Sequence, residues 1–450
     1  RLATQPRSVS ASANDTPVRT GKIRRVVIVG NGIAGVTAAR QVRRHHPDCH
    51  IDLVSRDRQA AYNRMAVASL LTRRNGMQGL YLEPDSWYAE QRITCWLNTH
   101  ATGLDTARQI VTLATGDTLG YDRLIIATGA QARVPQVAGF ASPGCFALRH
   151  AGDAMAIRAH LQRHEVHHAT VVGAGLLGLE AAAALRDLDL DVSVLSQTER
   201  VLDRQIDATA SALVREHLGS MKIKLVPNAE LSAVQRNSRG RVRRLQLADG
   251  RTVYSELVVA CIGTRADLAL AQLGGLATGR GILVDAQMRT SVPNIFAVGD
   301  VAEFDGQMPG LWGVAAEQAR VAALSALGLP AAYQASAPLT TLKLPGIVVR
   351  SAGQAQALGD HQRELVLPPP LPHDDDEPIS GEPAGYAKLV IQGRQVMGAV
   401  FVGDDPHADE FLQAASRQAE LASVRNLLGQ REHSTVVPPA QMAEADRRAA

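Results

Sequence analysis

Two glycine-rich turns of the same pattern constrain this chain more than any other feature. Both read G-x-G-x-x-G, at residues 30–35 and 173–178, and each follows a short β-branched run. Each turn opens an Ala-rich helical pattern, and a second apolar strand pattern follows at residues 50–54 and 191–195. This internal repeat predicts two βαβ units and therefore a mostly doubly wound α/β fold.

The glycines of such a turn have separate tasks. The first makes the tight turn, the second lets the backbone approach a pyrophosphate, and the third lets helix and strand pack closely. The pyrophosphate then lies at the helix N-terminus, where free N–H groups and the helix dipole favour negative charge. Because both copies follow a strand and open a helix, they predict two dinucleotide sites. The glycines are Gly30, Gly32 and Gly35 in the first turn and Gly173, Gly175 and Gly178 in the second.

Composition excludes several classes of protein. Hydrophobic residues make up 46% of the 450 and charged residues 20%, which is the composition of a globular chain. The net charge of +3 gives no strong field for nucleic acid or anionic lipid. The four cysteines show no C-x-x-C spacing, so we expect no metal site. No apolar stretch is long enough to span a membrane, and the sparse cysteines and the lack of a signal pattern favour the cytoplasm.

The ends of the chain and one internal stretch have a different composition. Residues 1–21 are rich in Ser, Thr, Ala and Pro, which is typical of a disordered tail or a linker to an upstream module. Residues 360–385 contain runs of Pro and Asp and predict an exposed loop. After it, residues 387–391 and 395–402 predict a β-hairpin around Gly393 in a small α+β domain. Residues 408–428 predict one helix that Gly429 stops, followed by a mobile tail.

Two further segments decide the family resemblance. They are residues 121–129, YDRLIIATG, and residues 290–300, TSVPNIFAVGD. Together with the two turns they resemble the two-dinucleotide flavoprotein reductases related to glutathione reductase, over about residues 23–330. The resemblance implies FAD at the first turn and NAD(P)H at the second. It implies an FAD domain at 22–138 and 265–330, an inserted NAD(P)H domain at 139–264, a C-terminal α+β domain at 331–404, and a helix and tail at 405–450.

Within this superfamily the chain looks most like the flavin portion of nitrite reductase large subunits, and next like rubredoxin reductases. The residues behind this are 62–64, 204–207, 386–390 and 398–404. The resemblance places Glu180 beside nicotinamide and flavin as the catalytic residue, unless it is an ordinary helix-face carboxylate. The cofactor-binding residues that it implies, besides the six glycines and Glu180, are Ile33, Ala34, Asp57, Asn63, Arg64, Ala127, Thr128, Gly129, Leu176, Leu177, Gly263, Gly299, Asp300 and Gln318.

Some of these assignments have plain structural alternatives. Asp300, expected on the FAD ribitol, could cap the following helix, and Arg64 could form a surface salt bridge. Gln318 and Trp312 resemble residues that approach the flavin ring, but they could equally be packing residues.

The departures from the family pattern are also informative. An acid usually ends the second strand and holds the adenosine ribose, but Ser55 and Ser196 stand there. Asp57 could substitute at the first site. At the second site neither an acid nor a well-placed Arg selects the nucleotide, so NADH is only mildly preferred over NADPH. Residues 62–75 contain no cysteine, so we expect no thiol chemistry.

The expected function is electron transfer between a nicotinamide nucleotide and a protein partner. Nicotinamide would reduce FAD, and electrons would leave singly to a rubredoxin, a ferredoxin or an iron-sulfur subunit. One alternative is a flavin subunit with mainly a docking role in a larger redox complex, for example an aldehyde oxidoreductase, with electrons running towards NAD. Another is an NADH oxidase. A homo- or hetero-oligomer is possible, and neither nucleic acid nor a membrane span is expected.

Overall fold

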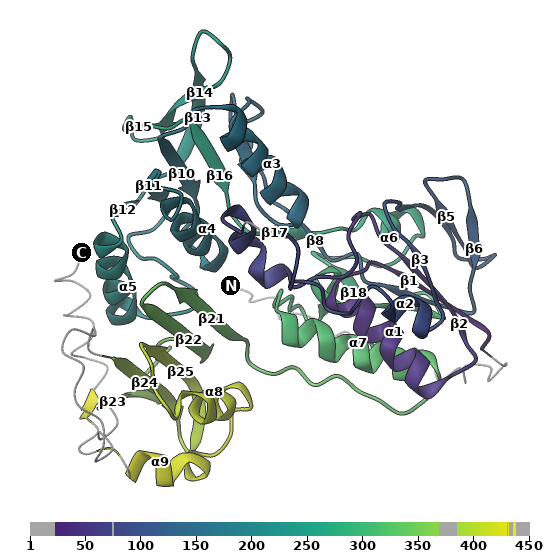
Figure 1. Cartoon of the computed structure of the whole chain (residues 1–450). Coiled ribbons are helices and arrows are strands. Elements are labelled where there is room, and N and C mark those ends of the chain that lie inside the picture. The colour runs from purple at the N-terminus through teal and green to yellow at the C-terminus, as the bar shows by residue number, and fades with distance from the viewer. Residues whose placement is uncertain (1–22, 74–75, 369–384, 430, 432–434, 438–450) are drawn as a thin grey trace, which may run out of the picture.

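The computed structural model describes residues 23–73, 76–368, 385–429, 431 and 435–437. The predicted linker at residues 1–21, most of the Pro/Asp-rich loop and most of the predicted tail lie outside the described residues. Figure 1 shows three domains: a first domain that contains both purple and green elements, a mostly teal second domain inserted between these two parts of the chain, and a yellow-green C-terminal domain beside the second.

The first domain is built on a parallel sheet of strand order β19-β7-β1-β2-β3. Helices α1 and α7 pack on one face of this sheet, and the small antiparallel sheet β4-β5-β6 lies over the other. The strands of the main sheet are β1 (Arg25–Val29), β2 (His50–Val54), β3 (Ile93–Trp96), β7 (Arg123–Ile126) and β19 (Ile295–Ala297). The covering elements are α1 (Ile33–His45), α7 (Trp312–Ala326), β4 (Ala101–Asp105), β5 (Ile110–Leu113) and β6 (Thr118–Gly120).

The second domain repeats the architecture with the strand order β12-β11-β10-β16-β9. Its helices are α3 (Ala151–Arg163), α4 (Leu176–Arg186) and α5 (Ala208–Ser220). Its strands are β9 (Cys145–Ala147), β10 (His168–Val172), β11 (Asp191–Leu195), β12 (Ile223–Val226) and β16 (Leu257–Ala260), with a second sheet of β13 (Leu231–Arg236), β14 (Val242–Leu247) and β15 (Thr252–Tyr254). The prediction of two Rossmann-like domains, the second inserted into the first, is confirmed.

The chain crosses between these domains at a two-stranded antiparallel ribbon. Strand β8 (Ala130–Ala132) leads out of the first domain, and β17 (Thr264–Ala266) pairs with it on the return. The 3-10 helix η1 (Arg64–Leu71) does not follow this division. It comes from the first part of the chain, yet its apolar residues pack in one core with α3 and α4 of the second domain. Helix η1 is therefore fixed where the two domains meet.

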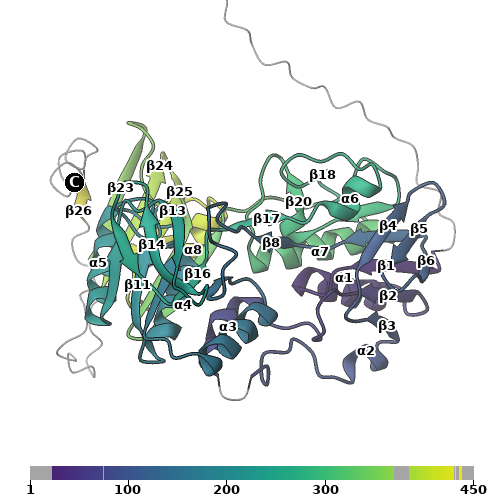
Figure 2. The ribbon, with the colours of Figure 1, turned by 90° about the horizontal axis from the view of Figure 1, so that it is seen from above.

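The C-terminal domain is a six-stranded antiparallel sheet of order β21-β22-β25-β24-β23-β26 with helix α8 on one face. Its other face shares a core with α4 and α5, so this domain packs on the second domain rather than on the first, as the view from above shows (Figure 2). The elements are β21 (Leu339–Leu344), β22 (Ile347–Gly353), β23 (Gln362–Leu367), β24 (Tyr386–Gln392), β25 (Gln395–Val402), β26 (Thr435–Val437) and α8 (Ala408–Ser416).

The predicted hairpin is present as β24 and β25, but two neighbouring predictions are wrong, one of them in part. Residues 362–367 of the predicted loop at residues 360–385 form strand β23, in which Gln362, Glu364 and Leu367 are buried, and residues 369–384 lie outside the described residues. The single helix at residues 408–428 is broken into α8, η3 (Leu421–Val424) and α9 (Arg425–Gly429). The break occurs because Ala419 accepts a hydrogen bond from the hairpin and Leu421 donates one to it, which pulls this stretch out of the helix.

Among the described residues, no helix combines the length and the apolar character that a membrane crossing requires.

Candidate active site

The two glycine-rich turns have nearly the same geometry. Gly30 and Gly173 have φ of +121° and +113°, in the region that side chains avoid. A Cβ on Gly30 would lie 2.0 Å from the carbonyl oxygen of Ala127 on the neighbouring strand. A Cβ on Gly35 would lie 1.8 Å from the Gly30 oxygen, so the third glycine is required for helix α1 to pack on the strand. The same holds for Gly178 against Gly173, at 2.0 Å.

The middle glycine of each turn differs from the other two. A Cβ on Gly32 or Gly175 would meet nothing within 4 Å, so the backbone there faces open space. These two glycines are the N-caps of α1 and α4, and neither helix has an acidic residue in its first turn. The N–H groups of both helix starts are thus available to an anion, with no carboxylate competing for them. This donor set fits the pyrophosphate of a dinucleotide.

A cavity of about 400 Å³ opens in front of the first turn. Its walls come from the ends of β1, β2 and β7, from the crossover at Thr128 and Gly129, and from the turn at Gly299. Thr99, at the far side, is 5% exposed, and its hydroxyl has no hydrogen-bond partner. In its size, its glycine-rich turn and the buried hydroxyl of Thr99, which has no partner, the cavity fits an extended dinucleotide such as FAD.

Three ion pairs line this cavity. Arg64 pairs with Asp57 at 2.6 Å, and Arg56 lies 3.1 Å from Asp267. Asp300 accepts a hydrogen bond from Arg149, the residue before the N-cap of α3. Asp300 caps no helix in the described part of the chain, because η2 (Gly299–Val301) has Val298 as its N-cap and α7 begins only at residue 312. The Arg149–Asp300 pair joins the two dinucleotide domains across the cavity.

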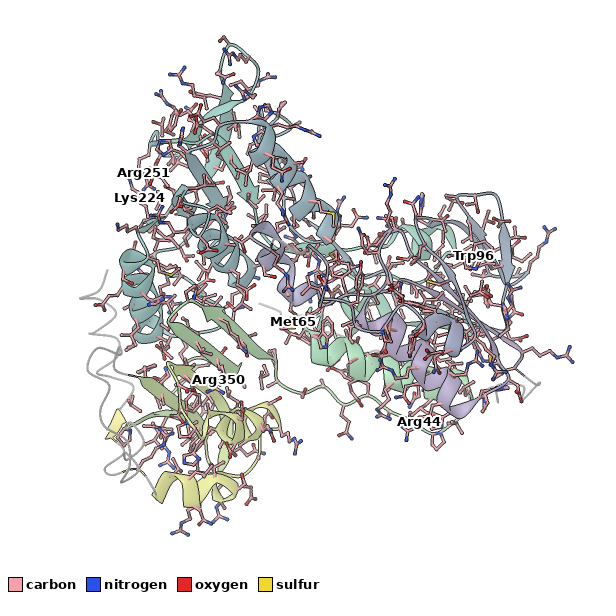
Figure 3. All side chains as sticks on the ribbon, in the orientation of Figure 1. Arg44, Met65, Trp96, Lys224, Arg251 and Arg350 are labelled. Atoms are coloured by element: carbon pink, nitrogen blue, oxygen red, sulfur yellow. The ribbon has the colours of Figure 1, made fainter. Side chains whose placement is uncertain are left out.

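A second cavity of about 230 Å³ adjoins the first and shares Arg64, Arg149 and Asp300 with it. Leu176, Leu177 and Glu180 of α4 form one side of it. The opposite side comes from the first domain, at residues 310–315, which include Trp312. Met65 of η1 and Thr341 of β21 complete the lining, so all three domains contribute. Met65 is 57% exposed and lies where the three domains face one another (Figure 3).

Glu180 is the titratable group of the second cavity with a large shift. Burial beside apolar groups disfavours its charged form and raises the pKa of its carboxyl to about 7. Such a pKa lets the carboxyl gain or lose a proton near neutral pH, which is typical of functional carboxylates in clefts.

The structure brings most of the predicted site residues together. Those lining the first cavity are Gly30, Gly32, Ile33, Ala34, Asp57, Arg64, Ala127, Thr128, Gly129, Gly299 and Asp300. Ile33, Arg64, Leu176, Leu177, Glu180 and Asp300 line the second.

The remaining predicted residues line neither cavity and have supporting contacts. Asn63 caps η1 by accepting from Met65 N–H at 3.0 Å. Gln318 is buried, and its Oε1 accepts from Gly299 N–H at 2.8 Å, which holds the Gly299 turn. Gly263 accepts from Arg133 N–H in the crossover ribbon. Gly35, Gly173, Gly175 and Gly178 shape the two turns.

Sequence reasoning missed Arg149, Met65 and Thr341. Arg149 lines both cavities, and its only signal is the capping box of α3, in which Asp153 accepts from His150 N–H. Thr341 reaches the site because the C-terminal domain packs on α4, which no local pattern could indicate.

The four cysteines are free, and none lines either cavity. Burial raises the pKa of the Cys95 thiol to about 11 and that of Cys261 to about 12. Within the described ranges, no group of His, Cys, Asp and Glu could hold a metal ion.

The sequence pattern of the pyridine nucleotide-disulphide oxidoreductase family matches residues 24–319. The chain belongs to this family. A protein of Bacillus subtilis (strain 168), the assimilatory nitrate reductase electron transfer subunit, is 30% identical over 418 residues, which are 92% of this chain and 52% of that protein. The rubredoxin-NAD(+) reductase of Pseudomonas putida is 34% identical over 280 residues, which are 62% of this chain and 71% of that protein.

A solved structure of the same family supports the assignment. The covalent putidaredoxin reductase–putidaredoxin complex superimposes with a TM-score of 0.76 at 27% identity, over 90% of this chain and 95% of that chain. The resemblance to nitrite reductase subunits and rubredoxin reductases is therefore confirmed. The chain spans about half the length of the nitrate and nitrite reductase relatives that it matches.

Proposed function

We propose that this oxidoreductase carries electrons between NADH and a one-electron iron-sulfur or rubredoxin-type protein, with FAD in the first cavity and nicotinamide in the second. The observation that carries the proposal is the adjoining of the two cavities, which share Arg64, Arg149 and Asp300. When bound, FAD supplies the conversion between two-electron and one-electron chemistry. Cavities in this arrangement would place the reacting rings in contact.

The chain's own residues have distinct tasks in this proposal. The helix starts at Gly32 and Gly175 bind the two pyrophosphates, and Asp300 orients the ribitol. Leu176 and Leu177 exclude water from the nicotinamide side of the second cavity. Glu180, as a carboxylate above its pKa of about 7, stabilises the positive charge that the nicotinamide ring gains as it is oxidised.

The preference for NADH is supported by the residues after β11. Glu199 stands four residues beyond the strand end and forms an ion pair with Arg215 at 3.0 Å, which neutralises this arginine. A 2′-phosphate near Glu199 would meet the negative charge of its carboxylate, which disfavours NADPH. A Glu199→Gln variant should therefore improve the affinity for NADPH and leave that for NADH within about twofold.

The free cysteines support a reducing compartment, which we propose to be the cytoplasm.

The test of the proposed reaction is an anaerobic titration of the FAD-loaded protein with NADH and then with NADPH, followed by the visible flavin absorbance. We expect stoichiometric bleaching by NADH, with a much higher concentration needed for NADPH. Bound FAD that neither nucleotide bleaches would refute the proposed function.

The partner would approach at the rim of the second cavity, where Met65 is exposed next to Leu311 and Trp312. A Met65→Asp variant whose flavin has first been fully reduced should deliver electrons to rubredoxin or ferredoxin about tenfold more slowly than the wild-type protein, in a measurement that does not include the NADH step. The matched control is Leu283→Asp, because Leu283 is an exposed apolar residue (42%) of β18 (Ile282–Val284) that lines neither cavity. Equal slowing by both variants would contradict this placement.

A second candidate function is a flavin subunit of a larger redox complex. It is favoured by the relative named an electron transfer subunit, which matches 92% of this chain. Light scattering after size exclusion separates the two candidates, because a complex subunit retains a stoichiometric partner and a shuttling reductase does not.

A further inference from the structure

A cluster of buried charges joins the second domain to the C-terminal domain, away from both cavities. Lys388 of β24 is 1% exposed, and its Nζ lies 2.5 Å from Asp207 Oδ2 and 2.9 Å from Glu364 Oε2. The hydroxyl of Tyr386 also donates to Asp207 Oδ2, at 2.9 Å. One ammonium thus faces two buried carboxylates, and only Asp207 comes from the second domain. Because buried carboxylates without a partner are costly, this cluster fixes Asp207 firmly.

Asp207 ends a short segment that we call the strap, residues 201–207, which is the last part of the connection from β11 to α5. Asp207 is the N-cap of α5, and its Oδ1 accepts from Ala210 N–H at 2.9 Å. At the other end of the strap, the backbone of Val201 donates to and accepts from the buried hydroxyl of Ser211, at 3.0 Å each. The strap is therefore anchored at both ends.

The middle of the strap lies against the second glycine-rich turn. Leu202 N–H donates to the carbonyl oxygen of Ala174, the residue between Gly173 and Gly175, at 3.0 Å. Leu202 has φ of +52°, a left-handed conformation that a leucine adopts only where its surroundings hold it. The Leu202 hydrogen bond fixes one peptide of the turn whose backbone faces the dinucleotide.

We propose that Lys388 is a positioning residue for nicotinamide nucleotide binding. It holds Asp207, Asp207 holds the strap, and the strap holds the second glycine-rich turn in its binding conformation. The affinity for the nucleotide consequently depends on the docking of the C-terminal domain through this route, in addition to the packing of β21 on α4. The inference rests on the proposed binding of NADH at the second turn.

The test measures flavin bleaching in a stopped-flow instrument against NADH concentration, which gives an apparent Kd and a limiting rate for each variant. Lys388→Met should raise the apparent Kd about tenfold and leave the limiting rate within about twofold, since only a binding interaction is weakened. Tyr386→Phe, which removes one hydrogen bond to Asp207, should raise it about threefold. FAD content, read from the visible absorbance per chain, should stay at the wild-type value in both variants.

The matched control is Arg431→Met. Arg431 is also a buried cation of the C-terminal domain, and it forms two hydrogen bonds to Asp405, at 2.6 and 2.7 Å, without contacting the second domain. It should lower thermal stability as Lys388→Met does, with the Kd for NADH unchanged.

An unchanged Kd in Lys388→Met, or an equal rise in Arg431→Met, would overturn the inference. If Lys388→Met does not fold, an unchanged Kd in Tyr386→Phe would overturn the inference. A wild-type protein that NADH does not bleach refutes the proposed function instead, so the two failures are distinguishable.

Discussion

Glu180→Gln gives the most direct test of how the second cavity works. Burial raises the pKa of Glu180 from an ordinary 4.5 to about 7. The carboxyl is then ionised to about 10% at pH 6 and about 90% at pH 8. If the carboxylate stabilises the charge that develops on nicotinamide, the limiting rate of flavin bleaching by NADH rises with the ionised fraction. We expect an increase of about ninefold between pH 6 and pH 8 in the wild-type protein.

The variant should remove this rise. Glutamine keeps the shape and a hydrogen-bonding side chain, but it cannot ionise. Its limiting rate should therefore be flat from pH 6 to pH 8 and close to the wild-type rate at pH 6. Arg64, Arg149 and Asp300 share the cavity and are unchanged, so the comparison isolates Glu180. A flat wild-type profile, or the same rise in the variant, would refute the reasoning.

Three further predictions follow from burial and packing. Because the folded pKa of Glu180 is raised, its ionisation opposes folding, so stability falls as pH rises from about 4.5 to about 7; Glu180→Gln should stabilise the protein at pH 8 by ~3 kcal/mol and change little at pH 4, measured by urea unfolding. Gly32→Ala should fold but lose FAD absorbance, because its methyl group meets no protein atom and instead takes up the open space in front of the turn. Gly35→Ala should lower the melting temperature, because its methyl group would collide with the carbonyl oxygen of Gly30. Replacing all four cysteines by serine should leave NADH-dependent dye reduction within about twofold, since burial holds the thiol pKa values at about 11 to 12 and almost no thiolate forms at pH 8. The cysteines are Cys49, Cys95, Cys145 and Cys261.

The parts of the fold that follow local rules could be predicted from the sequence. The second strand of each βαβ unit, β2 or β11, has the predicted bounds, and the first strand, β1 or β10, lies on the predicted β-branched run, because such a run ending in glycine has few alternatives. The helix at residues 408–428 failed for the opposite reason. Its apolar spacing is helical throughout, but hydrogen bonds to the β24–β25 hairpin at Ala419 and Leu421 outweigh that periodicity.

Strand β23 is an element that the sequence did not predict, because it depends on a contact with a distant part of the chain. Its sequence stands next to a run of prolines and carries Glu364, so it looks polar and loop-like. The strand forms because Glu364 has a buried partner, Lys388, on the neighbouring strand. A charged pair separated by 24 positions gives no signal in either segment alone. Arg149 and Thr341 at the site were missed for this reason, since their roles depend on which domains pack together.

The arrangement of the domains therefore matters to the proposed chemistry as much as the motifs do. The second and C-terminal domains share a core and the Lys388 cluster, and they form one unit. This unit, with η1 packed on it, meets the first domain through Arg149–Asp300 and through the pair of Arg64, in η1, with Asp57, and both pairs line the first cavity. An FAD molecule in that cavity would touch both sides of the junction. Its binding would consequently set the spacing between Glu180 on one side and the segment at residues 310–315 on the other, which is the space that nicotinamide must enter.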